Sequence, residues 1–279
     1  MGTTQSNGPG VAFIGAGAMG AAMIGGLAGG NDIGRARMIA SDRNEDRLAL
    51  VRDQFEVRTT LCNREAAREA DVVVLAVKPQ VLPAVLSELK GGIRQDALAL
   101  SIVAGASIGN IASLLQHRAI VRTMPNTPAQ VGEGMTVWTA TPEVSSEQRE
   151  QAGTIVGSLG RQLFVDDERF LDIATAISGT GPAYVFLMME ALIDAAVHLG
   201  FSRRDARELV VQTIRGAAIY AEHQPVHPAE LRNRVTSPGG TTAEALYQLE
   251  KGSFRTIMSK AVVAAFRRSV ALGEMSTPS

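Results

Sequence analysis

The sequence predicts an α/β domain followed by an all-helical domain, and two features of its pattern carry this prediction. Up to about residue 165, short apolar runs alternate with amphipathic segments, which is typical of βαβ units that build a parallel sheet. Beyond Asp166 the strand-like runs stop and long helical periodicity takes over. We therefore expect a Rossmann-like domain over residues 11–165 and an all-helical domain over residues 166–279, with residues 1–10 as a disordered leader.

The expected strands of the first domain are short apolar runs that suit a sheet buried on both faces. Asp71–Val77, with the letters DVVVLAV, is the clearest of them, because nearly every residue is β-branched or apolar. The other expected strands are Val11–Gly15, Arg37–Ser41, Leu98–Val103, Ala119–Thr123, Met135–Ala140 and Arg161–Val165. Amphipathic segments between them predict helices at about Met19–Leu27, Asn44–Gln54, Val81–Leu89, Ile108–Leu115 and Ser145–Leu159. Ser145 or Ser146 can cap the last of these helices.

The second half of the chain predicts helices separated by glycine and proline breaks. The expected helices are Phe170–Ile177, Ala183–Leu199, Arg203–Glu222, Pro228–Val235, Thr242–Leu249 and Phe254–Leu272, with breaks at Gly179–Pro182, Gly200, Pro225–Pro228 and Ser237–Gly240. The helices at 183–199 and 203–222 are apolar on more than one face. A helical segment of this size can hardly cover both of them, so we expect self-association through this half.

Composition and charge exclude several classes of function. The formal net charge is −1 and the basic residues are scattered, so the chain lacks the basic cluster of a nucleic-acid-binding protein. Cys62 is the only cysteine, which excludes an intrachain disulfide and favours a reducing compartment. We find neither a signal-peptide pattern nor an apolar stretch of membrane-span length, so we expect a soluble, cytoplasmic protein. His117, His198 and His223 lack the paired spacing of a metal site, and we expect no metal.

A glycine motif near the N-terminus points to a dinucleotide. The letters GAGAMG, residues 15–20, match G-x-G-x-x-G and lie between an expected strand and an expected helix, the context that the motif requires. Gly15 permits the tight turn, Gly17 lets the backbone approach a pyrophosphate, and Gly20 lets helix and strand pack closely. The helix N-terminus then faces the phosphate charge. The alternative is a glycine-rich turn without a ligand.

The end of the second expected strand carries signals for both nicotinamide cofactors. Asp42 can accept hydrogen bonds from an adenosine ribose 2′-hydroxyl, which favours NADH. Ser41 and Arg43 can instead hold a 2′-phosphate, which favours NADPH. The residues leave both cofactors open, and we favour NADPH slightly.

Five motifs resemble one known family. VAFIGAGAMG, LAVKP, RTMPNTP, SGTGPAY and TSPGGTT follow one another in this order, and a helix ending in EKGSFR comes after the last. Together they resemble pyrroline-5-carboxylate reductase from about Val11 to Leu272, nearly the whole chain. The resemblance implies an NAD(P)H-dependent oxidoreductase that transfers a hydride to the imine carbon of 1-pyrroline-5-carboxylate and gives L-proline, the last step of proline biosynthesis. It also implies an intertwined dimer that can assemble into a higher ring.

The resemblance implies which residues bind the cofactor. Asn63 matches a residue at the adenosine half, Ala76–Pro79 a loop under the cofactor, and Ala104-Gly105 the turn beside the nicotinamide. Asn126 belongs to a loop, Met124–Thr127, that closes round the nicotinamide end. With the glycine motif and the ribose segment, the expected cofactor-binding residues are Gly15, Ala16, Gly17, Ala18, Met19, Gly20, Ser41, Asp42, Arg43, Asn63, Ala76, Val77, Lys78, Pro79, Ala104, Gly105 and Asn126.

On the substrate side, the resemblance implies a carboxylate and a glycine-containing loop. Glu168 matches a substrate-side carboxylate, although it can also be a solvated charge in the Asp166–Arg169 cluster. The residues of the matched loop that hold the substrate carboxylate are Ser237, Gly239, Gly240, Thr241 and Thr242. The sequence departs from the family at Arg234, where an asparagine is expected three residues before Ser237, which puts one cofactor contact in doubt.

The reduction of a cyclic imine explains why such residues are needed. The substrate carboxylate requires backbone donors and hydroxyls, and the letters SPGGTT offer both just before a helix. From the residues alone, a simple capped helix start explains this loop equally well. Because a cyclic iminium is already protonated near neutral pH, a hydroxyl at the ring nitrogen can suffice, and Thr242 is the candidate catalytic residue. Thr242 either orients the nitrogen or relays a proton.

Three other functions remain as alternatives. A 2-hydroxyacid dehydrogenase of similar architecture uses a helical-domain lysine as base, and no lysine follows SGTGP within several turns here. A reductase of another cyclic imine needs the same chemistry and is harder to exclude. A dinucleotide-sensing regulator without turnover has no need for a second anion pocket such as SPGGTT.

Overall fold

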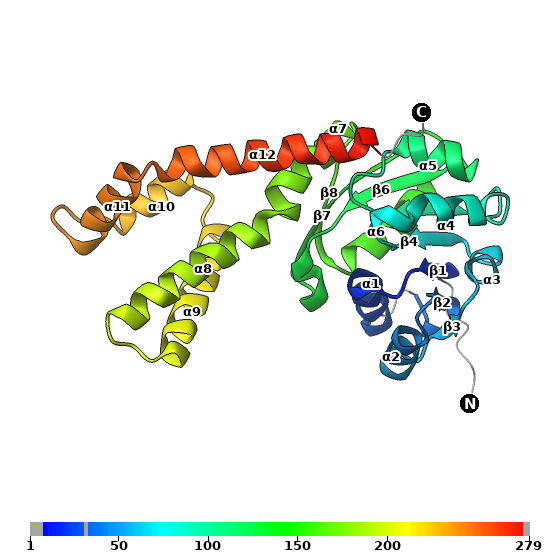
Figure 1. The fold of residues 1–279 in the computed structure, drawn as a ribbon, viewed down its shortest axis with the longest axis horizontal. Coiled ribbons are helices and arrows are strands. Elements are labelled where there is room, and N and C mark those ends of the chain that lie inside the picture. Colours follow the sequence, from blue (N-terminus) through cyan, green and yellow to red (C-terminus); the bar gives the residue numbers. More distant parts are fainter. Residues whose placement is uncertain (1–7, 31–32, 276–279) are drawn as a thin grey trace. The chain divides into compact units, whose positions relative to one another are not determined.

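The computed structural model describes residues 8–30 and 33–275, and the chain divides into two compact units (Figure 1). The first unit is Met1–Thr180 together with Ala265–Ser279, and the second is Gly181–Ala264. The first unit therefore includes helical residues beyond the predicted boundary at 165, because Leu171 and Ala174 pack against Val137 of the sheet. That the functional domains divide at residue 165 stays a prediction.

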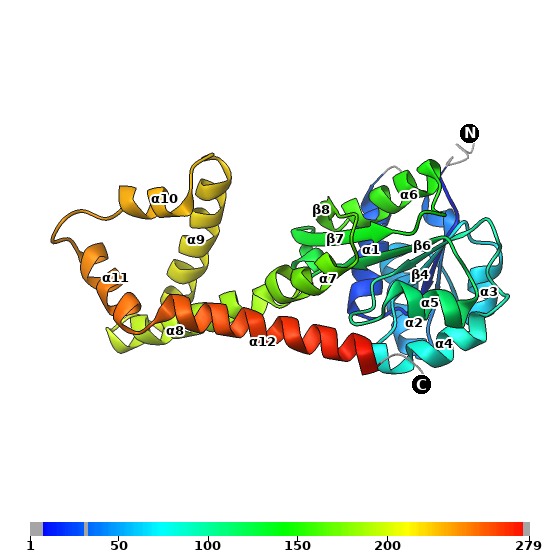
Figure 2. The same ribbon diagram turned by 90° about the horizontal axis from the view of Figure 1, so that it is seen from above.

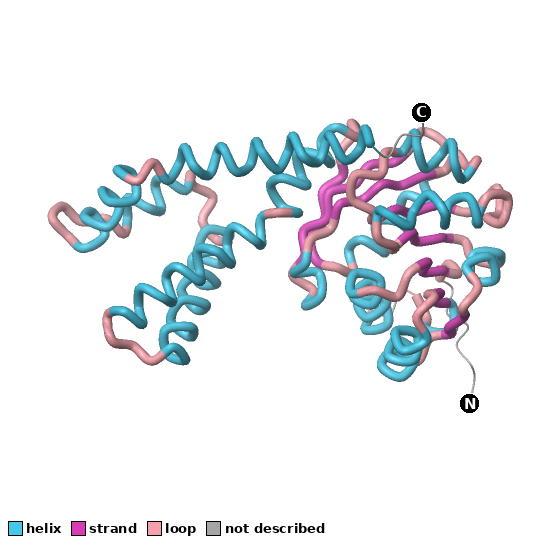
Figure 3. The backbone as a smooth tube through the Cα atoms, viewed as in Figure 1, coloured by secondary structure: helices cyan, strands magenta, loops and turns pink. Residues whose placement is uncertain are grey.

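The first unit is built on a twisted, mostly parallel sheet (Figure 3). Over the described residues it has eight strands in the order β3-β2-β1-β4-β5-β6-β7-β8, and only the β6–β7 pair is antiparallel. Their bounds are β1 Val11–Ile14, β2 Met38–Ser41, β3 Arg58–Thr60, β4 Val72–Leu75, β5 Leu98–Ser101, β6 Ile120–Met124, β7 Gly134–Ala140 and β8 Gly160–Phe164. The first six strands have the 3-2-1-4-5-6 order of the Rossmann fold, which confirms the predicted fold class.

Helices cover both faces of this sheet (Figure 2). One face carries α1 Ala18–Gly29, α2 Glu45–Phe55 and α6 Ser146–Gly157, and the other carries α3 Asn63–Arg68, α4 Leu82–Leu89 and α5 Ile108–Leu115. Side chains along β1 point alternately to the two faces of the sheet. Val11 and Phe13 belong to one core, Ala12 and Ile14 to the other, and all four are buried, so both faces need covering helices. Short 3-10 turns complete the unit at η1 Arg35–Arg37, η2 Pro79–Val81 and η3 Thr127–Val131.

Two features of the first unit differ from the expected pattern. Strand β3 has only three residues, none of them buried, so apolar periodicity did not predict it. The expected disordered leader lies mostly outside the described residues. Gly10, however, is buried and its N–H donates to Asp71 Oδ2 at 2.6 Å, so ordered structure begins before Val11.

The predicted break at Gly179–Pro182 is narrower than expected, because only Thr180, a bend, separates two helical elements. Helix α7 Arg169–Ala174 continues into a π-helical turn, η4 Thr175–Gly179, and α8 Gly181–His198 begins after the bend at Thr180. The N–H and the hydroxyl of Thr180 both donate to the Thr175 carbonyl at 2.8 Å, and Pro182 lies in the first turn of α8, where its missing N–H costs nothing.

This continuity also corrects the prediction about membrane-span length. Within the described residues, Arg169–His198 is one helix long and apolar enough to cross a membrane, with a mean hydropathy of 1.3 in its most apolar window. The expectation that no stretch reaches this length depended on the break. One such helix is weak evidence for a membrane span, since helices of soluble proteins meet the same criterion.

The second unit is helical throughout its regular structure. It contains α8, α9 Arg203–Glu222, α10 Pro228–Arg234, α11 Thr241–Lys251 and the first part of α12 Phe254–Met275. Helices α8 and α9 form a hairpin whose turn contains Gly200 at φ +114°, with Arg203 paired to Asp194 at 3.0 Å (Figure 1). No residue of α8 is buried, and Phe186 and Leu187 are 58% and 68% exposed. Such uncovered apolar side chains are typical of an interface.

Candidate functional site

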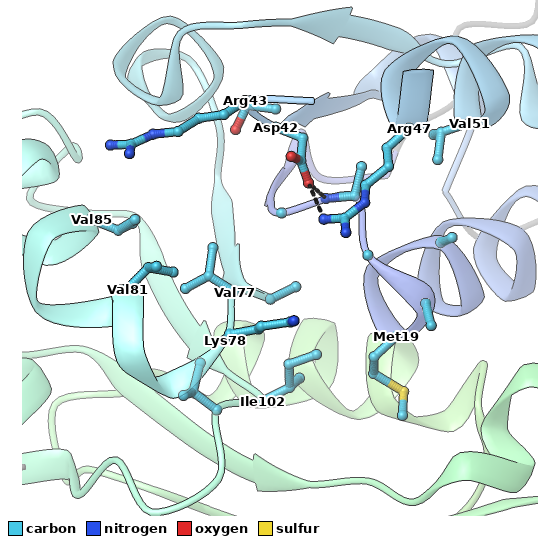
Figure 4. A pocket seen from close by; sticks show the side chains of 18 of the residues that line it. Met19, Asp42, Arg43, Arg47, Val51, Val77, Lys78, Val81, Val85 and Ile102 are labelled. Atoms are coloured by element: carbon cyan, nitrogen blue, oxygen red, sulfur yellow. Dashed lines mark hydrogen bonds and ion pairs between the residues drawn. The ribbon is translucent and has the colours of Figure 1, made fainter. Parts of the chain in front are cut away.

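A cavity of about 1000 Å³ opens at the carboxyl ends of β1, β2, β4 and β5 in the first unit (Figure 4). In a doubly wound sheet this is where a dinucleotide binds, at the point where strand order reverses between β1 and β4. The predicted cofactor residues among its lining are Gly15, Ala16, Gly17, Ala18, Met19, Ser41, Asp42, Arg43, Asn63, Ala76, Val77, Lys78, Pro79 and Ala104. Gly20, Gly105 and Asn126 do not line it.

The three motif glycines serve three different geometric needs. Gly15 has φ +111°, and a Cβ there would lie 2.6 Å from the Ala76 carbonyl oxygen, just after the neighbouring strand β4. A Cβ on Gly20 would lie 2.2 Å from the Gly15 carbonyl oxygen, so the first turn of α1 closes tightly on the loop. Around Gly17, by contrast, a Cβ would meet no atom within 4 Å. Gly17 therefore borders open space in the cavity, where a ligand can approach the backbone.

The N-terminus of α1 is suited to an anion. Gly17 is its N-cap residue, no side chain caps the helix, and no acidic residue occupies its first turn. The first N–H groups of a helix lack intrahelical partners, and together with the helix dipole they favour negative charge. An uncapped helix start beside open space therefore fits the pyrophosphate of a dinucleotide.

Asp42 is held by the backbone around the glycine motif. Its Oδ2 accepts the Ala16 N–H at 2.9 Å, and its Oδ1 accepts the Asn44 N–H at 3.0 Å. Arg47, from the first half of α2, lies 3.7 Å from the same carboxylate (Figure 4). Both oxygens of Asp42 thus have partners within the chain, and the side chain ties β2, the glycine loop and α2 together.

Three cationic side chains line the cavity with this one carboxylate. Arg43 and Arg47 lie on either side of Asp42, and the Lys78 amine extends into the cavity between Val77 and Met19 (Figure 4). All three cations are exposed to solvent in the chain as described. The charge balance of the cavity wall therefore favours a polyanionic ligand.

Ser41 and Asn63 form a chain of hydrogen bonds in the wall of the cavity. The Ser41 hydroxyl donates to Asn63 Oδ1 at 2.8 Å, and Asn63 Nδ2 donates to Glu88 Oε2 at 3.0 Å. Ser41 is fully buried and Asn63 is 8% exposed. Their predicted contacts with the cofactor stay predictions, and what the structure adds is that Ser41 orients the Asn63 amide.

Asn126 is engaged in holding two elements together. Its Nδ2 donates to the Ser178 carbonyl at 3.0 Å, and its Oδ1 accepts the Met135 N–H at 2.9 Å. The side chain thus fastens the residues after β6 to the π-helical turn and to β7. Met124 and Pro125, just before it, do line the cavity.

Glu168 is part of an ion-pair network rather than a freely solvated charge. Its Oε1 accepts the Ile108 N–H at 2.8 Å and lies 2.6 Å from Nη1 of Arg122, whose side chain is 6% exposed. The neighbouring Arg169 instead hydrogen-bonds Asp167 and holds the pKa of that carboxyl below its usual range. The predicted contact of Glu168 with the substrate stays a prediction.

The remaining predicted substrate residues lie in the second unit. Ser237–Gly240 is a turn closed by the Gly240 N–H donating to the Ser237 carbonyl at 3.0 Å, and Gly239 has φ +70°. Gly240 is the N-cap residue of α11, no side chain caps this helix, and Thr242 is its second residue. The arrangement again leaves helix-start N–H groups for an anion. At the unmatched position, Arg234 pairs with Glu230 at 2.6 Å.

Sequence reasoning missed the part of the cavity that α2 and α4 supply. Arg47, Leu50, Val51 and Gln54 line it from α2, and Val81 and Val85 line it at the start of α4. Their spacing of three and four residues puts each set on one helix face, and this periodicity was the available signal. Within the described residues, no three His, Cys, Asp or Glu side chains gather as a metal site would require.

Comparison with family models gives two matches. Residues 168–272 match the model described as pyrroline-5-carboxylate reductase dimerisation. Residues 10–105 match the model described as NADP oxidoreductase, coenzyme F420-dependent.

Individual relatives cover nearly the whole chain. A pyrroline-5-carboxylate reductase of Pseudomonas aeruginosa is 43% identical over 267 residues, which is 95% of this chain and 97% of that protein. The Escherichia coli protein of the same name is 36% identical over 95% of this chain and 98% of its own length. Among solved structures, the reductase of Coxiella burnetii has a TM-score of 0.88 at 39% identity, covering 95% and 99% of the two chains. A Plasmodium falciparum pyrroline carboxylate reductase with NADP bound has a TM-score of 0.87 at 36% identity, covering 96% and 99%.

Proposed function

The chain belongs to the pyrroline-5-carboxylate reductase family, and from this premise we propose that the cavity of the first unit binds NADPH and that the Ser237–Thr242 loop binds the substrate. The protein is an NAD(P)H-dependent oxidoreductase of proline biosynthesis, reducing the imine of 1-pyrroline-5-carboxylate to L-proline. The observation that carries the cofactor proposal is the open space at Gly17 beside the uncapped start of α1. Bound NAD(P)H supplies the hydride.

The preference for NADPH rests on the charges around the adenosine end of the cavity. A carboxylate that selects NADH must accept hydrogen bonds from the ribose hydroxyls. Both oxygens of Asp42 already accept backbone N–H groups. Arg43, exposed and lining the cavity, is available to a 2′-phosphate, and Arg47 lines the same wall while paired with Asp42 at 3.7 Å. These contacts support NADPH over NADH.

The arginines can be tested directly. We expect Arg43→Ala to raise KM for NADPH about tenfold and to leave KM for NADH nearly unchanged, because a charge-assisted hydrogen bond to phosphate is lost. Arg52→Ala is the matched control, since Arg52 is exposed on the following helix, α2, but does not line the cavity. Equal effects on both cofactors would contradict the proposed role.

The Ser237–Thr242 loop offers the groups that the imine substrate needs. Helix-start N–H groups and the hydroxyls of Ser237 and Thr241 suit the substrate carboxylate. The Thr242 hydroxyl is proposed to hydrogen-bond the ring nitrogen, orienting it or passing a proton to it. Glu168, already held by Arg122, is proposed to contribute its remaining oxygen on the substrate side.

Thr242→Ala tests the assigned catalytic role. We expect kcat to fall about 100-fold, while the Kd for NADPH changes little, because the hydroxyl acts on the substrate and not on the cofactor. Thr242→Ser keeps the hydroxyl and should retain most of the turnover. If Thr242→Ala turned over normally, another residue would have to serve the nitrogen.

Assembly and location complete the proposal. The protein self-associates through its dimerisation region, residues 168–272, and we propose that these dimers assemble further into a ring. The single, exposed Cys62 supports a reducing, cytoplasmic compartment. The formal net charge of −1 supports the absence of a nucleic-acid partner.

The decisive measurement follows the absorbance of NADPH and of NADH when pyrroline-5-carboxylate is added to the purified protein. Rapid oxidation with L-proline as product supports the proposal and ranks the two cofactors. Cofactor binding without turnover would instead direct the search to other cyclic imines or to a sensing role.

A further inference from the structure

A buried arginine inside the first unit pairs with two carboxylates. Arg122, in β6, has a side chain that is 6% exposed. Its Nη1 lies 2.6 Å from Glu168 Oε1, and its Nη2 lies 3.7 Å from Asp172 Oδ1. A buried guanidinium needs such partners, since an unpaired charge in the interior is strongly unfavourable. Arg122 thereby fixes where the two carboxylates of the α7 region lie.

One of these carboxylates holds the end of α12. The Ser269 hydroxyl donates to Asp172 Oδ1 at 2.8 Å, although the two residues are 97 positions apart in sequence. Ser269 is 4% exposed, in a helix end where the neighbouring Arg267 and Arg268 are exposed. Both partners belong to the first unit, which includes α12 from Ala265 onward. The hydrogen bond therefore docks the last turns of α12 onto this unit.

One turn further along, α12 packs against the loop that follows β5. Gly105 has φ +74° and is buried, and a Cβ built on it would lie 3.3 Å from Leu272 Cβ and 3.7 Å from the Gly273 nitrogen. A Cβ on Gly273 would in turn lie 3.5 Å from the Gly105 carbonyl oxygen. Two glycines thus allow the helix and the turn to approach backbone to backbone. The preceding residue, Ala104, lines the cavity together with Ile102 and Val103.

From these contacts we infer that the end of α12 is a positioning element for the nicotinamide end of the cavity. Arg122 and Asp172 anchor Ser269, the anchored helix holds Gly105 through Leu272 and Gly273, and the Ala104-Gly105 turn keeps the shape that the ring requires. Of these residues, only those of the Ala104-Gly105 turn need to contact the cofactor. The inference rests on the proposed binding of the dinucleotide in this cavity.

If α12 supports only the nicotinamide end, weakening its anchor should affect binding of the nicotinamide and not binding of the rest of the cofactor. NADPH and 2′-phospho-ADP-ribose differ only in the nicotinamide ring, so calorimetric titration of both compounds isolates the end that α12 supports. In Ser269→Ala we expect the Kd for NADPH to rise about fivefold, the equivalent of one lost hydrogen bond, with the Kd for 2′-phospho-ADP-ribose unchanged. Asp172→Asn, which weakens the same anchor from the other side, should show the same split.

Two further variants make the result specific. Ser269→Thr keeps the hydroxyl and should restore NADPH affinity relative to Ser269→Ala. Ser113→Ala, on the exposed face of α5, is the matched control and should change neither Kd. Equal weakening of both compounds, or no weakening of NADPH in either anchor variant, would overturn the inference.

The titrations need no substrate, so they are independent of turnover. A wild-type protein that binds both compounds but does not oxidise NADPH with pyrroline-5-carboxylate would overturn the substrate assignment. The Kd values of the Ser269 and Asp172 variants would still decide the role of α12. A wild-type protein that binds neither compound would overturn both proposals together.

Discussion

At the scale of single residues, the glycines of the motif have different roles: Gly20 is needed for the fold and Gly17 for the ligand. Gly20 faces the Gly15 carbonyl oxygen at a distance that no side chain tolerates, whereas Gly17 faces open space with φ −71°, which any residue can adopt. The same substitution at these two positions should therefore have opposite consequences.

We predict that Gly17→Ala keeps its thermal stability and loses dinucleotide affinity, because the new methyl group occupies the ligand's approach to the backbone. Gly20→Ala should lose stability, by about 1–3 kcal/mol, because the loop and α1 must move apart. Thermal unfolding without ligand, together with NADPH titration, distinguishes the two variants. A Gly17→Ala protein that binds NADPH normally would contradict the assigned path of the pyrophosphate.

The hydrogen-bond partners of Asp42 indicate a structural role for this carboxylate. In sequence it is a candidate ligand for a ribose, yet in the structure its carboxylate joins Ala16 and Asn44. We predict that Asp42→Ala weakens NADPH and NADH alike, since the glycine loop loses its tie to β2. Parallel KM measurements with both cofactors check this, and a selective loss of NADH would show that Asp42 contacts the ribose after all.

At the scale of elements, α6 shows a cap that local sequence nearly determines. The Ser145 hydroxyl accepts the Gln148 N–H at 3.2 Å, and the Gln148 side chain accepts the Ser145 N–H at 3.0 Å, which completes a capping box. The sequence left Ser145 and Ser146 as alternatives, and the structure selects Ser145.

The two serines provide a matched pair for measurement. Ser145→Ala should lower the free energy of unfolding by about 1 kcal/mol, because a helix N–H loses its acceptor. Ser146→Ala, one residue into the helix, should change it by no more than a few tenths of a kcal/mol. Chemical denaturation of both variants tests the assignment, and equal losses would contradict it.

At the scale of the whole molecule, the second unit leaves its apolar helices uncovered. No residue of α8 is buried, and Leu187 and Phe186 are more than half exposed. The dimerisation family match over residues 168–272 includes this helix, so we expect self-association to cover these side chains.

We predict that Leu187→Asp weakens the assembly, because a charge cannot be buried there without a partner. Sedimentation velocity should show a shift toward smaller species, and the thermal midpoint should become more dependent on concentration. Leu61→Asp is the control, since Leu61 is similarly exposed, at 54%, but lies in the first unit. A Leu187→Asp protein of unchanged size would place the interface elsewhere.

The sequence by itself determined those features of the fold that depend on residues close together in the chain. Alternation and helical periodicity predicted the α/β domain and the helices after it, and the spacing of three glycines predicted the turn at the start of α1. These features follow from local backbone geometry and from which face of an element is apolar, and both are written in contiguous segments. The uncovered faces of α8 and α9 were predictable for the same reason.

Only the tertiary structure decided which distant groups meet. The bond between Ala16 and Asp42, the pairing of Arg122 with Glu168, and the anchor between Asp172 and Ser269 join residues that are 26, 46 and 97 positions apart. No local pattern specifies such pairs, because each depends on how whole elements pack.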